Sequence, residues 1–360
     1  MQGPIFIVGT MRSGSTLLRL VLDSHEHIAI GDETGFMRAA TGIKDVPDFH
    51  SGAGWYRRFG LTEADIDERV RRFYADIFSD HAARQGKRRW GEKTPFHAMY
   101  MREMATMFPD CVFVGMVRHP GAVAVSKMRR TSTLEHSIAN WVRVNSQLVR
   151  MSRALAGQGR LAVVRYEDLV ARTEPTLRQL MAFLGEPWSP GLLEHHRVQR
   201  GKGAPRIVDG GTRTREPIDP ARADEWRARI APAQLRRVAE ATASLRQVFG
   251  YDERGALDLD GDADRRGRGR GPEEDADRRG PEEDAGAPVC LLDGERLRSR
   301  QRGLRPDLRR TVLELPPREE RLPAVPPTRA QRLLRMLRTD ARYSLRRLPL
   351  IRRARGHDRG

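Results

Sequence analysis

A glycine-containing turn near the start of the chain has the spacing of a phosphate-binding loop. The run "FIVGTMRSGSTLLRLVLDSH" (6–25) reads as an apolar strand, a turn and an amphipathic helix, with Gly9 and Gly14 in a G-x-x-x-x-G frame. Backbone N–H groups at such a helix N-terminus bind anions, and the glycines let a phosphate approach closely. The lysine of a nucleoside triphosphatase is absent, because Ser15 follows Gly14, while Arg12 supplies a cation earlier. The loop therefore predicts a site for one phosphate with a charged group held beside it.

A second apolar run ends in a cation where a triphosphatase would place a carboxylate. The run "CVFVGMV" (111–117) predicts a buried parallel strand, and Arg118 follows it directly. An aspartate there would organise Mg²⁺, whereas an arginine attracts a phosphate. Ser126 and Arg130 come eight and twelve residues later, so we expect them on the next helix, facing the same edge of the sheet. These residues predict a second phosphate site and no metal, which fits a nucleotide phosphorylated on two different carbons.

Alternating strand and helix patterns must position these residues. They predict an α/β fold class, a three-layer P-loop-type fold with a central parallel sheet flanked by helices. The expected strands are 5–8, 111–117 and 161–169, the last ("LAVVRYEDL") ending in a polar turn. The expected helices, from apolar residues at helical spacing, are 17–22, 134–156 and 177–184. Gly185 stops the last of these helices.

The amino-acid composition changes sharply near residue 252, which predicts a domain boundary there. The chain has 360 residues, enough for one large α/β domain, and its net charge of +17 predicts anionic partners. We expect a folded domain over 1–252, a disordered charged linker over 253–289 and a basic, partly helical Arg/Leu-rich tail over 290–360. Residues 331–353 form a basic amphipathic pattern, typical of weak contact with an anionic membrane or a protein. A solvated tail with no specific partner is the alternative that we favour.

Cysteine content and hydropathy favour a reducing compartment. The two cysteines, Cys111 and Cys290, lie in unrelated contexts, so we expect no disulfide framework and no cysteine-based zinc site. No run approaches the roughly 18 apolar residues that span a bilayer. The core strand over 5–8 leaves no room for a signal peptide. We therefore expect a cytoplasmic protein without a transmembrane segment.

The two phosphate segments resemble those of the sulfotransferases, enzymes that use 3′-phosphoadenosine 5′-phosphosulfate (PAPS) as sulfuryl donor. "RSGSTLLRLVLDSH" (12–25) is similar to their 5′-phosphosulfate loop, and "VRHPGAVAVSKMRR" (117–130) to their 3′-phosphate segment. Further matches, in family order, resemble the protein-tyrosine sulfotransferase branch and its bacterial relatives. They are Asp23-Ser24-His25, Gly31 to Thr34, Lys93 to Phe96, Arg165 to Val170 and Phe183 to Trp188. The resemblance covers residue 4 to about residue 250 and implies PAPS-dependent sulfuryl transfer without a metal.

The resemblance also implies a role for each candidate residue. The implied catalytic residues are Glu33, Lys93 and Arg12. Glu33 would act as general base and Lys93 would stabilise charge on the leaving oxygen. A helix N-terminal acid and a surface lysine are the respective alternatives. The implied nucleotide-binding residues are Arg12, Ser13, Gly14, Ser15 and Thr16 for the 5′-phosphosulfate, Arg118, Ser126 and Arg130 for the 3′-phosphate, and Tyr166. A buried strand-end tyrosine is nearly as plausible for Tyr166.

Two departures from the family pattern concern the acceptor and the nucleotide. Gly35 stands where the peptide-specific branch has an arginine, and Arg38 lies nearby in another register. Glu216 stands where the branch has a nucleotide-contacting lysine, so that Arg213 or Arg215 would take this role. The first departure argues against a tyrosyl-peptide acceptor. The family's membrane anchor is also missing, which favours a soluble bacterial enzyme acting on a sugar, lipid-linked or secondary-metabolite hydroxyl. A peptide tyrosine stays open as the acceptor.

Three other function classes compete with this interpretation. A P-loop kinase or ATPase would need the lysine after Gly14 and an acidic strand end, and has neither. A nucleic-acid binder would interleave aromatic and basic residues, which the first 250 residues do not. A degenerate family member that binds nucleotide without turnover is the best non-enzyme alternative. It would have no reason to keep Glu33 and Lys93 in register with the loop.

Overall fold

The computed structural model describes residues 3–46, 54–130, 132–155, 157–202, 216–251 and 291–302. The chain divides into two compact units, Met1–Glu314 and Leu315–Gly360, and the second lies wholly outside the described residues. The predictions for Arg213, Arg215, the charged linker over 253–289 and the amphipathic pattern over 331–353 also fall outside these ranges.

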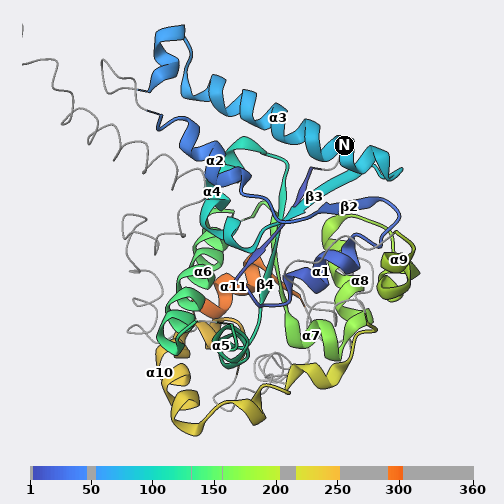
Figure 1. The fold of residues 1–360 in the computed structure, drawn as a ribbon, viewed down its shortest axis with the longest axis vertical. Helices are drawn as coiled ribbons and strands as arrows, with labels where there is room; N and C mark the ends of the chain where they lie inside the picture. Colours follow the sequence, from blue (N-terminus) through green and yellow to red (C-terminus); the bar gives the residue numbers. More distant parts are fainter. Residues whose placement is uncertain are drawn as a thin grey trace, which may run out of the picture. The chain divides into compact units, whose positions relative to one another are not determined.

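Six strands form one sheet, in the order β2-β3-β1-β4-β5-β6 (Figure 1). They are β1 (Ile5–Gly9), β2 (Ile28–Gly31), β3 (Arg89–Lys93), β4 (Val112–Val117), β5 (Leu161–Arg165) and β6 (Leu291–Asp293). The first five pair in parallel and β6 pairs with β5 in the antiparallel direction. Because five parallel strands end at one edge of the sheet, the residues that follow them meet there. The predicted α/β fold class is confirmed.

Alternating side chains of the strands enter two hydrophobic cores, one on each face of the sheet. Along β1, Phe6 and Val8 belong to one core, and Ile5 and Ile7 to the other. Helices cover both faces and lie to the left and right of the sheet in Figure 1. The first core includes side chains of α3 (Glu63–Arg84), α4 (Met101–Met107), α6 (Leu134–Ala154), α10 (Pro232–Val248) and α11 (Gly294–Arg302). The second core includes side chains of α1 (Ser15–Leu22), α7 (Tyr166–Ala171) and α8 (Thr173–Leu184).

Shorter elements complete the fold around this sandwich. They are α2 (Phe36–Ile43), η1 (Trp55–Phe59), η2 (Pro95–Tyr100), α5 (Pro120–Met128), η3 (Pro190–Leu192), α9 (His195–Gly201), η5 (Pro220–Ala223) and η6 (Arg227–Arg229), where η marks a 3₁₀ helix. Two of them, α5 and the η5–η6 segment, lie beside the strand ends that carry the candidate residues.

Most of the predicted elements are confirmed, and one is wrong in its second half. The helices α6 and α8 match the expectations over 134–156 and 177–184, and Gly185 ends α8 with a φ of 67°. The strand expected over 161–169 stops at Arg165, and α7 begins at once. Acidic residues in the first turn favour a helix start, and Glu167 and Asp168 occupy that turn.

A segment beyond the charged linker returns to the sheet. We expected 290–360 to be a basic tail, yet β6 pairs with β5 and α11 packs on α6. Leu291, Leu292 and Leu297 are buried in the two cores, which explains why this short piece is held. Gln301 donates from its side-chain amide to Ser152 Oγ (3.2 Å) and fixes the end of α11. A three-residue apolar strand gives too weak a periodic signal to be predicted.

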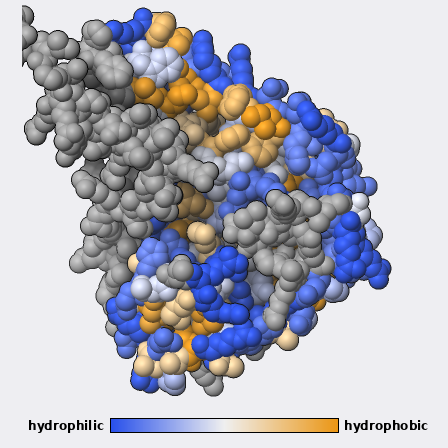
Figure 2. Space-filling model, viewed as in Figure 1, coloured by the Kyte–Doolittle hydropathy of each residue, from blue (hydrophilic) through white to orange (hydrophobic). Residues whose placement is uncertain are grey.

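The surface carries one concentration of exposed apolar side chains. Figure 2 shows apolar side chains gathered toward the end of the molecule formed by α2 and α3. Five of the six large hydrophobic residues exposed in the described ranges fall within 43–77, with Phe59 73% exposed and Phe73 63% exposed. Across the same ranges, none of the helices has both the length and the apolar character needed to cross a membrane.

Candidate active site

The turn between β1 and α1 has the backbone of an anion-binding loop. Arg12 adopts a φ of 74°, a left-handed conformation that costs energy for a residue with a side chain. Gly14 has a φ of 98°, and a Cβ atom there would lie 2.4 Å from Tyr166 Cδ2. Glycine is therefore required both by the backbone and by the ring of Tyr166. This contact brings the loop against the end of β5.

The loop presents donors that fit an anion. The first N–H groups of α1 have no partner within the helix, as at every helix N-terminus. Within the described part of the chain, the buried hydroxyl of Ser13 has no hydrogen-bond partner. An orphaned hydroxyl beside free helix N–H groups fits a phosphate or sulfate group. The predicted roles of Ser15 and Thr16 as loop donors stay predictions.

Glu33 and Lys93 form an ion pair beside this loop. Lys93 Nζ contacts Glu33 Oε1 and also donates to Thr16 Oγ1 (3.4 Å). Burial lowers the pKa of Lys93, and the neighbouring Glu33 carboxylate partly offsets that effect. The Lys93 side chain is 3% exposed, so the alternative of a surface lysine is wrong, whereas Glu33 is 36% exposed and can meet a ligand. A carboxylate and a cation therefore lie together beside the predicted anion-binding loop.

The second strand end supplies the other predicted anion site. Arg118 follows β4, and its guanidinium lies 4.1 Å from the ring centre of Tyr166. Arg118 also donates to the Arg222 carbonyl oxygen (3.3 Å). Arg12 Nε donates to Ser126 Oγ (3.0 Å), which joins the loop to α5. Burial raises the pKa of the Tyr166 hydroxyl, so the ring stays neutral.

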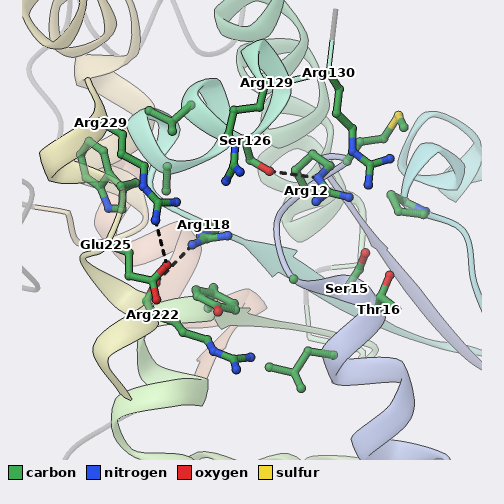
Figure 3. Close-up of a pocket in the computed structure, with 18 of the residues that line it drawn as sticks. Arg12, Ser15, Thr16, Arg118, Ser126, Arg129, Arg130, Arg222, Glu225 and Arg229 are labelled. Carbon is green, nitrogen blue, oxygen red and sulfur yellow. Dashed lines mark hydrogen bonds and ion pairs between the residues drawn. The ribbon is translucent and has the colours of Figure 1, made fainter. Parts of the chain in front are cut away.

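One cleft of about 290 Å³ is lined by residues of both predicted anion sites. Its walls include these predicted residues: Arg12, Gly14, Ser15, Thr16, Glu33, Arg118, Ser126, Arg130 and Tyr166. Lys93 reaches the cleft through Glu33, and Ser13 is buried in the loop. Figure 3 shows Arg12, Arg118 and Arg222 directed into the cleft from different elements. Six arginines line it against two glutamates, so the cleft suits a ligand with several negative charges.

Ten lining residues were not predicted, and five of them have charged or aromatic side chains: Arg129, Arg222, Glu225, Trp226 and Arg229. Of these five, all but Arg129 come from the segment that contains η5 and η6, roughly a hundred residues beyond Arg118. Trp226 is held by stacking on His119, with ring centres 4.6 Å apart, and a Cβ atom on Gly121 would meet it at 2.3 Å. Nothing in the local sequence encodes this long-range contact. Arg129 could have been found, because it adjoins Arg130.

Glu216 does not line the cleft but holds a residue that does. Its carboxylate accepts from Arg222 Nη2 (2.6 Å), and Asp219 lies 4.0 Å from Arg222 Nε. The Arg222 side chain is 15% exposed and enters the cleft near Tyr166. A positive charge therefore stands six residues after the position where the family pattern has its lysine.

One cluster of potential metal ligands lies elsewhere, in residues 25–27. His25 Nε2 donates to the Pro187 carbonyl oxygen (2.9 Å), because its Nδ1 already accepts from the His27 N–H group (3.0 Å). His27 Nδ1 lies 3.3 Å from Glu186, which also binds two arginines. Both nitrogens of His25 are thus engaged, and the cluster is explained by these contacts.

The fold and the cleft together define a class of protein. A helix N-terminus at the carboxyl edge of a parallel sheet, facing cationic walls, is the arrangement of a P-loop-type nucleotide-binding protein. A family model described as "Sulfotransferase family" matches residues 4–190. The chain belongs to the sulfotransferase family. This confirms the family that the sequence resembles.

Curated relatives and a solved structure agree with this assignment. The chain is 26% identical over 261 residues to protein-tyrosine sulfotransferase 1 of Danio rerio, covering 69% of this chain and 72% of the relative. It is 27% identical over 270 residues to the Homo sapiens protein of that name, covering 69% of each. The sulfotransferase domain of the Synechococcus PCC 7002 olefin synthase superposes with a TM-score of 0.51 at 26% identity. That match covers 70% of this chain and 97% of the domain.

Proposed function

We propose that this protein transfers a sulfuryl group from PAPS to a hydroxyl acceptor, with Glu33 as general base. The observation that carries the proposal is a cleft lined by the glycine-containing loop, by Arg118 and Ser126 of the second predicted site, and by Glu33, which pairs with Lys93. A bisphosphorylated nucleotide has one phosphate for each site. Membership of the sulfotransferase family supports the same donor.

The nucleotide would be held by residues of both walls. The loop Arg12–Thr16 would bind the 5′-phosphosulfate, with Ser13 satisfied by one of its oxygens. Arg118 and Ser126 would bind the 3′-phosphate, and Arg130 would add charge at the rim. Tyr166 would contact the nucleoside, and Arg222 would take the place proposed for Arg213 or Arg215. All these groups are fixed cations, hydroxyls or N–H groups, which suit polyanion binding without a metal.

The chemical step would divide between Glu33 and Lys93. The acceptor oxygen forms a bond to sulfur while Glu33 takes the hydroxyl proton. The bond between sulfur and the oxygen bridging to the 5′-phosphate breaks, and its electron pair stays on that oxygen. Adenosine 3′,5′-bisphosphate leaves. Lys93 would neutralise the charge that develops on the leaving oxygen, once it is drawn away from Glu33.

The acceptor class stays a proposal among the expected hydroxyls. The named relatives are tyrosine sulfotransferases, which favours a phenolic hydroxyl. Gly35 favours other acceptors, because it has no side chain to supply the cation that the peptide-specific branch has at this position, and a Cβ atom there would meet nothing within 4 Å. A panel of sugar, lipid-linked, secondary-metabolite and tyrosyl-peptide hydroxyls separates them.

Calorimetric titration with nucleotides tests the donor. We expect adenosine 3′,5′-bisphosphate to bind at least tenfold more tightly than ADP or ATP, and equally with Mg²⁺ or EDTA, because two separated cationic sites need two phosphates. Arg237→Ala is the matched control, since Arg237 pairs with Glu135 on the surface outside the cleft (3.0 Å). Tighter binding of ATP with Mg²⁺ would overturn the proposal and favour a kinase or ATPase.

A further inference from the structure

A second glutamate lies directly behind the Glu33–Lys93 pair and is fully buried. Glu92 precedes Lys93 at the end of β3, and its side chain is 0% exposed. Three hydroxyls donate to its carboxylate: those of Tyr74, of Thr34 (2.5 Å) and of Thr94 (2.6 Å). His97 Nδ1 lies 3.2 Å from the same carboxylate. A carboxylate can be buried when donors surround it in this way.

The partners of Glu92 connect it to the segment that carries Glu33. Thr34 follows Glu33, and besides donating to Glu92 its hydroxyl accepts from the Phe36 N–H group at the start of α2 (3.3 Å). The Thr34 N–H group in turn donates to Thr94 Oγ1 (3.0 Å). These bonds fasten the end of β2 to the end of β3. The backbone of Glu33 therefore has little freedom to move away from β3.

The last two residues of β3, Glu92 and Lys93, point to opposite faces of the sheet and contact different partners. Neighbouring residues of a strand point to opposite faces of the sheet. Lys93 points toward α1, where it meets Glu33 and Thr16, whereas Glu92 points toward α3, where it meets Tyr74. Residues 92 and 93 thus hold residues 34 and 33, respectively, from the two sides of the sheet.

We propose that Glu92 is a positioning residue that fixes the Glu33 segment, through Thr34, at the distance from Lys93 that proton transfer requires. This inference rests on the proposed function, because it assigns Glu33 the role of base. A general base displaced by about 1 Å can cost on the order of a hundredfold in rate. Glu92 itself is not among the residues that line the cleft.

The test compares Glu92→Gln with Thr34→Val and with the double variant. Each single variant should lower kcat about tenfold and leave the affinity for adenosine 3′,5′-bisphosphate within about twofold, because the anion loop is untouched. Since Glu92 acts through Thr34, the double variant should lose little more than either single one. Rates are referred to the concentration of bisphosphate-binding sites, so that unfolded protein does not count.

Glu167→Gln provides the matched control. Glu167 is also buried and accepts a tyrosine hydroxyl, from Tyr251 (2.8 Å), but it accepts the N–H group of His119 (3.0 Å) beside Arg118 as well. This variant should weaken bisphosphate binding instead of lowering kcat selectively. If Glu92→Gln and Glu167→Gln gave the same pattern, Glu92 would be an ordinary core residue and the inference would fall.

Modification of Lys93 by an amine reagent, followed by mass spectrometry, does not depend on turnover. Glu92→Gln should raise the Lys93 labelling rate several-fold, as Glu33→Gln should, because both loosen the same ion pair. If Lys93 were labelled faster in Glu92→Gln but the wild type did not turn over PAPS, the proposed function would be wrong while the positioning role of Glu92 would be supported. Unchanged labelling and unchanged kcat in Glu92→Gln would overturn the positioning role itself.

Discussion

The two halves of the cleft differ in how their charges are balanced. In the catalytic half, Lys93 and Glu33 contact each other, so their charges cancel within the protein. In the nucleotide half, Arg222 pairs with Glu216 (2.6 Å) and Arg229 with Glu225 (3.8 Å), but six arginines line the cleft against two glutamates, so cations outnumber carboxylates along its walls. The difference indicates a division of labour. Under the proposed function, the nucleotide half would bind the anion and the catalytic half would move the proton.

The support behind each half is similar. A buried glutamate lies behind each one and accepts a tyrosine hydroxyl, Tyr74 on Glu92 and Tyr251 on Glu167. Burial raises the pKa of Glu167, and the His119 N–H group and Arg118 act in the opposite direction. Substitutions can therefore break one half without the other, and each tests whether the two are separable.

Among the substitutions that test this comparison, Lys93→Met should have the largest effect, a loss of kcat. It removes the cation of the catalytic half, and we expect kcat to fall about a thousandfold while bisphosphate affinity changes less than about threefold. Steady-state kinetics and calorimetry on the same preparation measure both. An equal loss of nucleotide affinity would move Lys93 into the nucleotide half and remove the distinction between them.

Arg118→Ala should produce the opposite pattern. A charged hydrogen-bonding group lost from a phosphate site costs about 2–3 kcal/mol, or roughly a hundredfold in bisphosphate affinity. At saturating PAPS, kcat should fall much less. The dependence of the affinity on salt should also become shallower, because one cation fewer contacts the ligand. A wild-type affinity in this variant would place the 3′-phosphate elsewhere.

A double-mutant cycle on Arg222 and Glu216 sharpens the description of the nucleotide half. Arg222→Ala should weaken bisphosphate binding about tenfold, and Glu216→Ala about threefold, because Glu216 only orients the arginine. The double variant should match Arg222→Ala. Strictly additive losses would show that Glu216 acts on the nucleotide independently of Arg222.

The smallest expected effect is that of His119 on the pH dependence of the free energy of unfolding. Burial, with Arg246, Arg227 and Arg118 nearby, lowers the pKa of His119 to about 3. In the unfolded chain His119 takes up a proton near pH 6.5, whereas in the native state it stays neutral. The free energy of unfolding should therefore fall by roughly 1 kcal/mol, on account of His119, as the pH falls from about 7 to about 5.5. His119→Asn should therefore unfold with a flatter pH profile in urea titrations. A parallel profile would mean that His119 is protonated in the native state.

The sequence predicts those parts of the site that depend on local spacing. The loop from Arg12 to Thr16 and the strand end at Arg118 carry their signal within a few residues, because turn geometry and strand ends are local properties. Trp226 and Arg222 reach the cleft only through tertiary contacts, with Gly121 and Arg118 respectively. Glu92 is not predicted from the sequence for a different reason. In the sequence, Glu92 next to Lys93 resembles a charged pair on the surface. Only the strand geometry shows that the two side chains point to opposite faces of the sheet.

Turnover of PAPS tests the central claim most directly. Chromatography of the nucleotides follows conversion of PAPS to adenosine 3′,5′-bisphosphate with a mixture of sugar, lipid, metabolite and tyrosyl-peptide hydroxyls, for the wild type and Glu33→Gln. We expect acceptor-dependent conversion by the wild type and at least about a hundredfold less by Glu33→Gln, with bisphosphate affinity preserved in the variant. Equal conversion by both proteins would contradict the role of Glu33. Bisphosphate binding without conversion by either would identify a nucleotide-binding protein that has lost its catalysis.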